Sequence, residues 1–387
     1  MPWKVELLMD ARLSFMLEAL RPGAKTFEQV CCEHRISRQC GDKWRKRFLR
    51  EGANGLADRS RRPRGSPHAT PAAVQQRVVA LRQRYGWGAR KIQVLLAGEG
   101  AWVSIAGANR IIARNGLLRE RDRQRPATQR FAREACNELL QLDFKGDYAV
   151  REGKCYPLVL VDDCSRYLHG LWPLGGQSTE LVAGSLQLFF REVGVPQAML
   201  LDHGTPWWST SNVHGLTRFS VWLLQQGIQL IYAGVGHPQT QGKVERLNRT
   251  LHERTRHEGI PETRQQWEVW AGVFRQEYNQ VRPHEALGMR TPAQVYRPDN
   301  LRPYVEHPPA WDYGEGVSVR RLNPQGALEY RQRRLFVCEA LAGERVRLDE
   351  VNDLLLVTFR TTTVREIDLR SGRSRAVVLP RDYYSHA

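Results

Sequence analysis

The sequence predicts a multidomain protein in which all-α helix-turn-helix units precede an α/β domain and a small C-terminal β-barrel. The chain has 387 residues, more than one ordinary hydrophobic core requires. Apolar residues recur at helical spacing up to about residue 118, and short apolar runs typical of strands begin near residue 139. One Arg-rich stretch that contains Pro divides the helical region, a second separates it from the strands, and neither can build a core of its own.

The changes in composition set the expected domain boundaries. We expect a first helix-turn-helix domain at 1–55, a basic linker at 56–69, a second helix-turn-helix domain at 70–118, a basic linker at 119–131, an α/β domain at 132–300 and a β-rich domain at 301–387. Each of the four domains can bury apolar residues of its own.

Positive charge is concentrated at the start of the chain. The net charge is +17, and residues 1–130 carry 27 Lys and Arg against 11 Asp and Glu. Such a field suits a polyanion, since each neutralised phosphate releases condensed counterions. We therefore expect double-stranded DNA as a partner; the alternative is a surface that is merely basic.

The composition also predicts the compartment. No run of 18 or more apolar residues appears, and the N-terminus lacks a secretory pattern, so we expect no membrane partner. The seven cysteines are an odd number spread over a long chain, which is no disulfide framework. We expect a cytoplasmic protein.

A short cluster of cysteines and one histidine raises the question of zinc. Cys31, Cys32, His34 and Cys40 lie close together in the sequence. The spacing lacks a second ligand pair at the usual distance, so we expect these thiols to belong to a helix core instead.

The first helical domain has the signals of a helix-turn-helix motif. Thr26 can begin one helix and Ser37 the next, on which Trp44 and Phe48 share a face. The second helix is expected to enter a major groove, and a plain three-helix packing module is the alternative. DNA contacts are predicted for Arg38, Gln39, Lys43 and Arg45 on this helix and for Arg59, Arg61 and Arg62 in the linker.

A second helical domain follows the linker. It runs from Pro71 to about Leu118, with a break at residues 85–88 and an end at Asn115-Gly116. Two such domains in tandem would let one chain read a longer stretch of DNA.

The middle domain alternates strands and helices after an initial set of strands. The strands are LLQLDF, YAV, YPLVLVDD, QAMLLD and IQLIYA, and helices are expected near 181–190, near 219–226 and from Thr240. This order predicts a mixed sheet flanked by helices. From Val317 to about Leu379, short β runs with a hairpin turn at Asn323 to Gly326 predict the barrel.

Three carboxylates stand where the middle domain could bring them together. Asp143 lies inside an apolar strand, Asp202 ends another, and Glu245 lies early in a helix. A carboxylate in such a strand is costly to bury unless it binds a metal or a partner. Oxygen ligands of this kind suit two Mg²⁺ or Mn²⁺ ions that promote phosphodiester transfer.

Each acid also has an ordinary structural interpretation. Asp143 is a possible strand-end cap, Asp202 a turn former, and Glu245 half of a surface ion pair with Arg249. The tandem acids Asp162 and Asp163 are a rival metal site.

Several ordered motifs carry a resemblance that spans nearly the whole chain. They are GLADRSRRP at 55–63, LQLDFKG at 140–146, DDCSRY at 162–167, DHGTPW at 202–207, HPQTQGKVERLNRTL at 237–251 and YNQVRPHEALGMRTPAQVY at 278–296. With these motifs the sequence resembles the bacterial insertion-sequence transposases of the Asp-Asp-Glu type, relatives of retroviral integrases.

The resemblance implies a fold, a site and partners. The middle domain would have the ribonuclease-H-like fold, with Asp143, Asp202 and Glu245 as catalytic metal ligands. The helical domains would bind terminal inverted repeats, and the protein would act as at least a dimer on element ends and target DNA, in a bacterial cytoplasm. Lys243 and Arg246, beside Glu245, would hold phosphates of the DNA end.

The chain departs from the family pattern in two places. His203 stands where the family usually has Asn, and 42 residues separate Asp202 from Glu245. An insertion around Ser209 to Phe219 would explain the spacing. A domesticated or inactive copy that only binds DNA, and a general nuclease, are the alternatives to a transposase.

Overall fold

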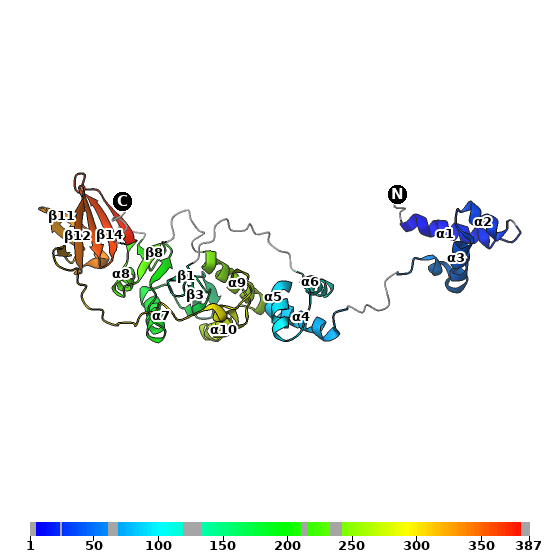
Figure 1. Ribbon diagram of the computed structural model, residues 1–387, viewed down its shortest axis with the longest axis horizontal. Helices are drawn as coiled ribbons and strands as arrows, with labels where there is room; N and C mark the ends of the chain where they lie inside the picture. The colour runs from blue at the N-terminus through cyan, green and yellow to red at the C-terminus, as the bar shows by residue number, and fades with distance from the viewer. Residues whose placement is uncertain are drawn as a thin grey trace. The chain divides into compact units, whose positions relative to one another are not determined.

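The structure is a computed structural model, and it describes residues 5–23, 25–60, 69–118, 133–209, 215–232 and 242–380. The chain divides into two compact units, 1–69 and 70–387, which are described separately. Figure 1 shows the order of the elements along the chain. No helix among the described residues is long and apolar enough to cross a membrane.

The first unit is a small helical bundle. Its elements are α1 (Val5–Ala19), α2 (Phe27–Glu33), α3 (Arg38–Glu51) and a short 3₁₀ turn, η1 (Gly52–Leu56). Thr26 and Ser37 cap α2 and α3 as predicted, since each side chain accepts a bond from a backbone N–H of the first turn. A core that includes Phe15, Val30 and Trp44 holds the helices together.

Gly41 inside α3 has a packing reason. A Cβ at this position would lie 2.5 Å from the Cys31 Sγ of α2 and 3.0 Å from the Phe15 ring of α1. Glycine costs about 1 kcal/mol of helix propensity relative to alanine, but only glycine lets the three helices approach this closely. Cys31 is therefore a buried core thiol as expected, whereas Cys32 is exposed.

The second unit begins with another three-helix domain, which follows the predicted breaks. It consists of α4 (Ala72–Tyr85), α5 (Ala89–Gly98) and α6 (Ile105–Arg114). Gly86 ends α4 in the left-handed conformation, and the Ser104 side chain begins α6 by accepting from Gly107 N at 3.0 Å. Val78, Ile92 and Ile111 lie in its core.

A mixed six-stranded sheet forms the centre of the second unit. Its strands are β1 (Leu139–Phe144), β2 (Tyr148–Val150), β3 (Gly153–Asp162), β4 (Leu168–Leu174), β5 (Ala198–Leu201) and β8 (Gln229–Tyr232). Their order is β2-β3-β1-β5-β8, with β4 on β3. β1 is antiparallel to β3 and parallel to β5, and β5 is parallel to β8, so the predicted mixed sheet is confirmed.

Helices cover both faces of this sheet. They are α7 (Thr179–Glu192), α8 (Arg218–Gln225), α9 (Gly242–Glu258) and α10 (Arg264–Gln276). Side chains of β3 alternate between two cores: Leu158 and Leu160 pack with α7 and α8, and Val159 and Val161 pack with α9 and α10.

Several parts of this domain were not predicted, helix α10 among them. β4 was missed because its sequence, LHGLWPL, contains Gly and Pro and no apolar alternation, yet it pairs with β3 along most of its length. The expected insertion after Asp202 contains a short pair, β6 (Trp208–Ser209) with β7 (Gly215–Leu216). The expected start of the last helix at Thr240 lies outside the described residues, and α9 is described from Gly242.

The C-terminal region is β-rich, as predicted. A five-stranded antiparallel sheet has the order β15-β14-β13-β12-β9, and two further strands form a hairpin. The five are β9 (Ser318–Arg321), β12 (Arg345–Val351), β13 (Leu354–Phe359), β14 (Thr362–Asp368) and β15 (Ser374–Pro380), and the hairpin is β10 (Ala327–Tyr330) with β11 (Arg333–Phe336). Closure into a barrel is not confirmed, because no pairing joins β15 to β9 among the described residues.

The hairpin predicted at Asn323 to Gly326 is wrong in its pairing. The turn exists, since Gly326 N donates to Asn323 O at 2.9 Å. The strands on its two sides do not pair with each other, because β9 pairs with β12 and β10 with β11. A turn signal fixes local backbone geometry but not the partner of each strand.

Candidate active site

The sheet brings Asp143 and Asp202 together. Leu139 of β1 pairs with Ala198 of β5, and Gln141 with Leu200, in a parallel register. Two further residues along both strands lead to Asp143 and Asp202, and neighbouring strands lie about 4.8 Å apart. The two carboxylates therefore lie at the same edge of the sheet, as the sequence predicted.

Helix α9 brings Glu245 to the same place. Its first turns pack on β1, where Val244 N donates to Gln141 Oε1 at 3.2 Å. One turn after Glu245, Asn248 Nδ2 donates to Asp143 Oδ2 at 2.8 Å. Residues three apart share a helix face, so the contact of Asn248 also turns Glu245 toward Asp143.

The electrostatics of Asp143 show that the three acids are neighbours. Burial, followed by the negative charge of Asp202, raises the pKa of Asp143 to about 7, and Glu245 adds to the rise. The hydrogen bond from Asn248 opposes this shift. A buried carboxyl beside two others repels negative charge and favours a proton or a cation.

Asp202 is fixed by the segment that follows it. Its Oδ1 accepts a bond from Gly204 N at 2.8 Å and another from the Trp207 indole Nε1. The Trp207 ring is buried and stacks on Phe144, with centroids 5.5 Å apart. Trp207 and Asn248 had no predicted role, although they stand in the motifs DHGTPW and HPQTQGKVERLNRTL.

His203 lies in an aromatic cluster. Its ring is 4.8 Å from that of Trp208, edge to face, and 5.6 Å from that of Tyr232. Both rings belong to segments that follow Asp202 in the chain. These contacts give His203 a packing role beside Asp202.

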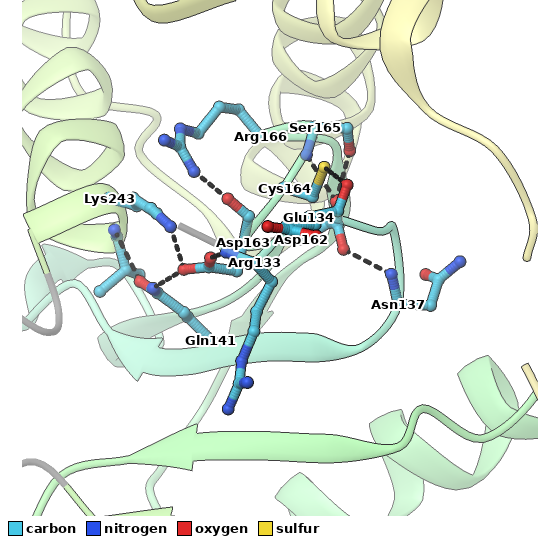
Figure 2. A network of polar contacts seen from close by, with 11 residues as sticks. Arg133, Glu134, Asn137, Gln141, Asp162, Asp163, Cys164, Ser165, Arg166 and Lys243 are labelled. Atoms are coloured by element: carbon cyan, nitrogen blue, oxygen red, sulfur yellow. Dashed lines mark hydrogen bonds and ion pairs between the residues drawn. The ribbon is translucent and has the colours of Figure 1, made fainter. Parts of the chain in front are cut away.

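The tandem acids Asp162 and Asp163 form a separate, saturated network (Figure 2). Asp162 accepts bonds from Asn137 N at 2.8 Å and from the Ser165 backbone and hydroxyl at 2.7 and 2.6 Å. Asp163 accepts from Arg133 N and Gln141 Nε2, both at 2.7 Å. Both carboxylates are fully buried, and their partners leave little room for a metal.

Lys243 belongs to this network. Its ammonium forms an ion pair with Asp163 Oδ1, and the side chain is only 10% exposed. Burial lowers the pKa of Lys243, which the bond to Asp163 partly offsets. The predicted phosphate contact by Lys243 thus has a competing partner inside the protein, whereas Arg246 is exposed beside Glu245.

The predicted DNA contacts of the first unit are mostly exposed. Arg38, Gln39 and Lys43 are exposed on α3, whereas Arg45 is half-buried with its guanidinium 4.5 Å from the Phe27 ring centroid. Arg59 forms an ion pair with Glu51. Arg61 and Arg62 lie outside the described residues.

A different group of potential metal ligands appears beside the saturated network. One ligand atom each from Cys136, Asp162 and Cys164 lie within 4.8 Å of one another. Cys164 Sγ already donates to Glu134 O at 3.3 Å, and burial raises the pKa of this thiol to about 11. A protonated thiol is a poor metal ligand. Among the described residues no comparable group includes the cysteines of the first unit.

Comparisons with known proteins agree with this arrangement. Two models described as "Integrase core domain" match residues 133–238 and 226–292. A "Helix-turn-helix domain" model matches residues 11–64, and a "Homeodomain-like domain" model matches residues 40–112.

Individual relatives are insertion-element proteins. The insertion element IS407 31.7 kDa protein of Burkholderia multivorans is 24% identical over 59% of this chain and 81% of its own length. The insertion element IS476 39.2 kDa protein of Xanthomonas euvesicatoria is 27% identical over 60% of this chain and 67% of its own. Among solved structures, the HTLV-2 integrase catalytic core domain in complex with magnesium is 18% identical, with a TM-score of 0.31 over 42% of this chain and 97% of that one.

The family matches and the relatives agree with each other. The integrase core model that matches residues 133–238 covers Asp143 and Asp202, and the one that matches residues 226–292 covers Glu245. The chain carries an integrase core domain and helix-turn-helix domains, and it is consistent with an insertion-sequence transposase of the integrase-like type.

Proposed function

We propose that this protein is a DNA transposase that cuts DNA at the ends of its element and joins the freed 3′ ends to target DNA. The observation that carries the proposal is the meeting of Asp143, Asp202 and Glu245 at one edge of the sheet, where Asp202 and Glu245 raise the pKa of Asp143. The helix-turn-helix domains on the same chain support a sequence-specific DNA substrate.

The residues at this edge fit a pair of Mg²⁺ or Mn²⁺ ions. All three acids offer oxygen ligands, and both bonds to Asp202 that the described residues provide end on Oδ1, which leaves Oδ2 for a cation. Asn248 Oδ1 is a buried acceptor without a donor among the described residues. The ligand atoms of the three acids do not all lie within 4.8 Å of one another in this structure. When bound, the two ions would activate the attacking oxygen and stabilise the leaving one.

Other residues of the chain hold Asp143 and Asp202 in fixed orientations. Asn248 fixes Asp143, and Gly204 with Trp207 fixes Asp202, so neither carboxylate must reorganise when the DNA arrives. No nucleophilic side chain is needed, because phosphoryl transfer depends mainly on alignment and charge.

The proposed reaction consists of two displacements at phosphorus. In the first, a water oxygen bonds to phosphorus at the element end, the bond to the 3′ oxygen breaks, and that oxygen takes up a proton. In the second, the resulting 3′-hydroxyl bonds to a target phosphorus, loses its proton to solvent, and releases a target 3′-hydroxyl. One phosphodiester forms for each that breaks in the second step, so it requires no other energy source.

The helical domains would bind the terminal inverted repeats. In the first unit, α3 presents the exposed side chains of Arg38, Gln39 and Lys43, as a helix entering a major groove requires. Arg45 and the linker arginines Arg59, Arg61 and Arg62 would add backbone contacts. Arg246 would hold a phosphate near Glu245, and Lys243 would do so only by leaving Asp163.

We also propose that at least two copies act together on DNA. Two element ends must be held at once, and each needs an acidic site. Leu188 on α7 and Val269 on α10 are exposed, and other residues of these helices and of β4 line a hollow of about 370 Å³ that a second copy would cover.

The test is strand transfer in solution. A labelled duplex copied from the end of the element is incubated with plasmid and Mg²⁺, using wild type, Asp202→Asn and Glu245→Gln. Joining by the wild type alone supports the proposal, whereas joining by either variant contradicts the site. End binding without joining by the wild type would favour the DNA-binding remnant, and cutting that ignores the end sequence would favour a general nuclease.

A further inference from the structure

Helix α9 is shared between the acidic site and the second helical domain. Glu245 lies on the first turn of α9, where its charge acts on Asp143. Further along α9, Arg254 Nη1 donates to Arg84 O at 3.4 Å, and His257 Nε2 lies 2.5 Å from Gln83 O. Both carbonyls belong to the end of α4, so the helix that carries Glu245 also contacts the domain expected to bind DNA.

A buried acid strengthens this contact. Glu277, at the start of the π-helical turn η3 (Glu277–Val281), pairs with Arg84 Nη2 at 3.0 Å and with Arg254 Nη2 at 2.9 Å. Val281, at the end of the same turn, packs against the hydrophobic core of the second helical domain. Apolar packing and a bridging carboxylate therefore fix this domain on the integrase core.

Two buried side-chain nitrogens at this junction have no hydrogen-bond partner among the described residues, and His284 Nε2 is a donor in one of its two neutral tautomers. The Arg282 guanidinium lies 5.6 Å from the Trp87 ring centroid, and its Nη2 donates to Thr250 Oγ1 at 3.2 Å. Its Nε is buried and makes no hydrogen bond. The Nε2 of His284, two residues later, is also buried and without a partner. A buried unsatisfied donor is costly, so adjacent ones indicate a missing acceptor.

Lys91, on the first turn of α5, lies close enough to Arg282 and His284 for their charges to interact. It makes no hydrogen bond or ion pair with the part of the chain that the structure describes, and Arg282 and Arg246 are charges that act on it. Burial, followed by the Arg282 charge, lowers the pKa of Lys91 to about 7, which two exposed acids, Glu253 and Glu285, only partly offset. Burial, followed by the Arg282 and Lys91 charges, lowers the pKa of His284 to about 3, so its ring is neutral near pH 7 and takes part through a hydrogen bond, not through charge.

We propose that Lys91, Arg282 and His284 bind one backbone phosphate of the element's DNA at the junction of the second helical domain and the integrase core. Arg246, next to Glu245, lies at the edge of this group. The phosphate oxygens would accept hydrogen bonds from Arg282 Nε and His284 Nε2. The phosphate charge would give Lys91 an anionic partner. The DNA strand would thereby be held at a set distance from the acidic site.

This inference rests on the proposed function, because it takes DNA as the substrate. A phosphate is favoured over a carboxylate because three donors from two domains converge, and phosphate oxygens can accept from several directions at once. The site differs from the predicted contacts of α3, since it lies inside the second unit and beside Glu245.

The experiment compares Lys91→Met with Arg90→Met, which removes the same charge from an exposed neighbour on α5. Binding to the end duplex is measured with a series of duplexes, each carrying one neutral methylphosphonate linkage near the cleavage position. We expect one linkage at which the neutral group weakens wild-type binding about tenfold. The same linkage should have little further effect on Lys91→Met and its full effect on Arg90→Met.

The outcomes are distinguishable. Equal losses at every linkage in wild type and Lys91→Met would overturn the phosphate site while leaving the proposed function intact. A second result would also overturn the DNA-phosphate site: inorganic phosphate raises the melting temperature of wild type but not of Lys91→Met, and no linkage is sensitive. The site would then bind free phosphate and not the DNA backbone. Absence of wild-type joining would instead overturn the proposed function. Lys91→Met should melt no lower than wild type, because it removes a half-buried charge without a partner.

Discussion

Two acidic clusters lie in the same core and differ in how their oxygens are used. Asp162 and Asp163 are fully buried, and backbone N–H groups, side chains and Lys243 satisfy them (Figure 2). Asp143 and Asp202 are half-buried, keep oxygens for other ligands, and repel each other and Glu245. Tandem acids in a sequence are thus weaker indicators of a metal site than single acids that three separate elements bring together.

The largest effect on DNA joining should come from the cluster of Asp143, Asp202 and Glu245. Replacing Glu245 by Gln removes one metal ligand without changing its size, and joining should fall at least about 100-fold. Stability should hold or rise, since one repelling charge is lost. Strand-transfer assays and thermal unfolding of the same preparation check this, and a stable protein with wild-type joining would show that Glu245 is no ligand.

The Asp162 and Asp163 cluster should respond in the opposite way, with a loss of stability. Replacing Asp163 by Asn leaves the Lys243 ammonium buried without its carboxylate, and the free energy of unfolding should fall by about 3–5 kcal/mol. The double variant Asp163→Asn/Lys243→Met should recover much of this loss, as chemical denaturation would show. If Asp163→Asn unfolds like the wild type but cannot join DNA, the saturated cluster is part of the chemistry.

A smaller effect is expected from a residue that positions a ligand. Trp207→Phe keeps the ring that stacks on Phe144 but removes the N–H bonded to Asp202. We expect roughly tenfold slower joining and a higher Mg²⁺ concentration for half-maximal rate, because one hydrogen bond to a charged group is lost. An unchanged metal requirement would limit Trp207 to packing.

The smallest effect concerns acid stability outside both clusters. Burial, with a contribution from Arg275, lowers the pKa of His169 to about 3. Between pH 6.5 and about 3 the unfolded chain binds a proton that the folded protein refuses, so this histidine makes stability fall as the pH falls through that window. His169→Phe should flatten this pH dependence in unfolding titrations from pH 7 to 4; an unchanged slope would show that His169 is not its source.

Local features of the fold were predictable because they depend on neighbours in sequence. Thr26 and Ser37 begin helices through bonds to residues three positions ahead, and the Gly86 break follows from its left-handed conformation. The strands of the mixed sheet were predictable from their apolar runs. β4 and the partners of β9 were not, because no local pattern specifies which distant strand completes a pair.

The candidate site also has features that depend on single residues and features that depend on contacts between distant residues. The sequence by itself determined that Asp143 lies in an apolar strand, that Asp202 ends another and that basic helices precede both, since burial cost and charge are properties of the residues. Only the tertiary structure decided that Lys243 pairs with Asp163, that Asn248 and Trp207 hold Asp143 and Asp202, and that Arg282 acts on Lys91. The physical reason is that hydrogen bonds and ion pairs act over a few ångströms, and residues far apart in sequence reach that distance only when the sheet register and the packing of α9 are set.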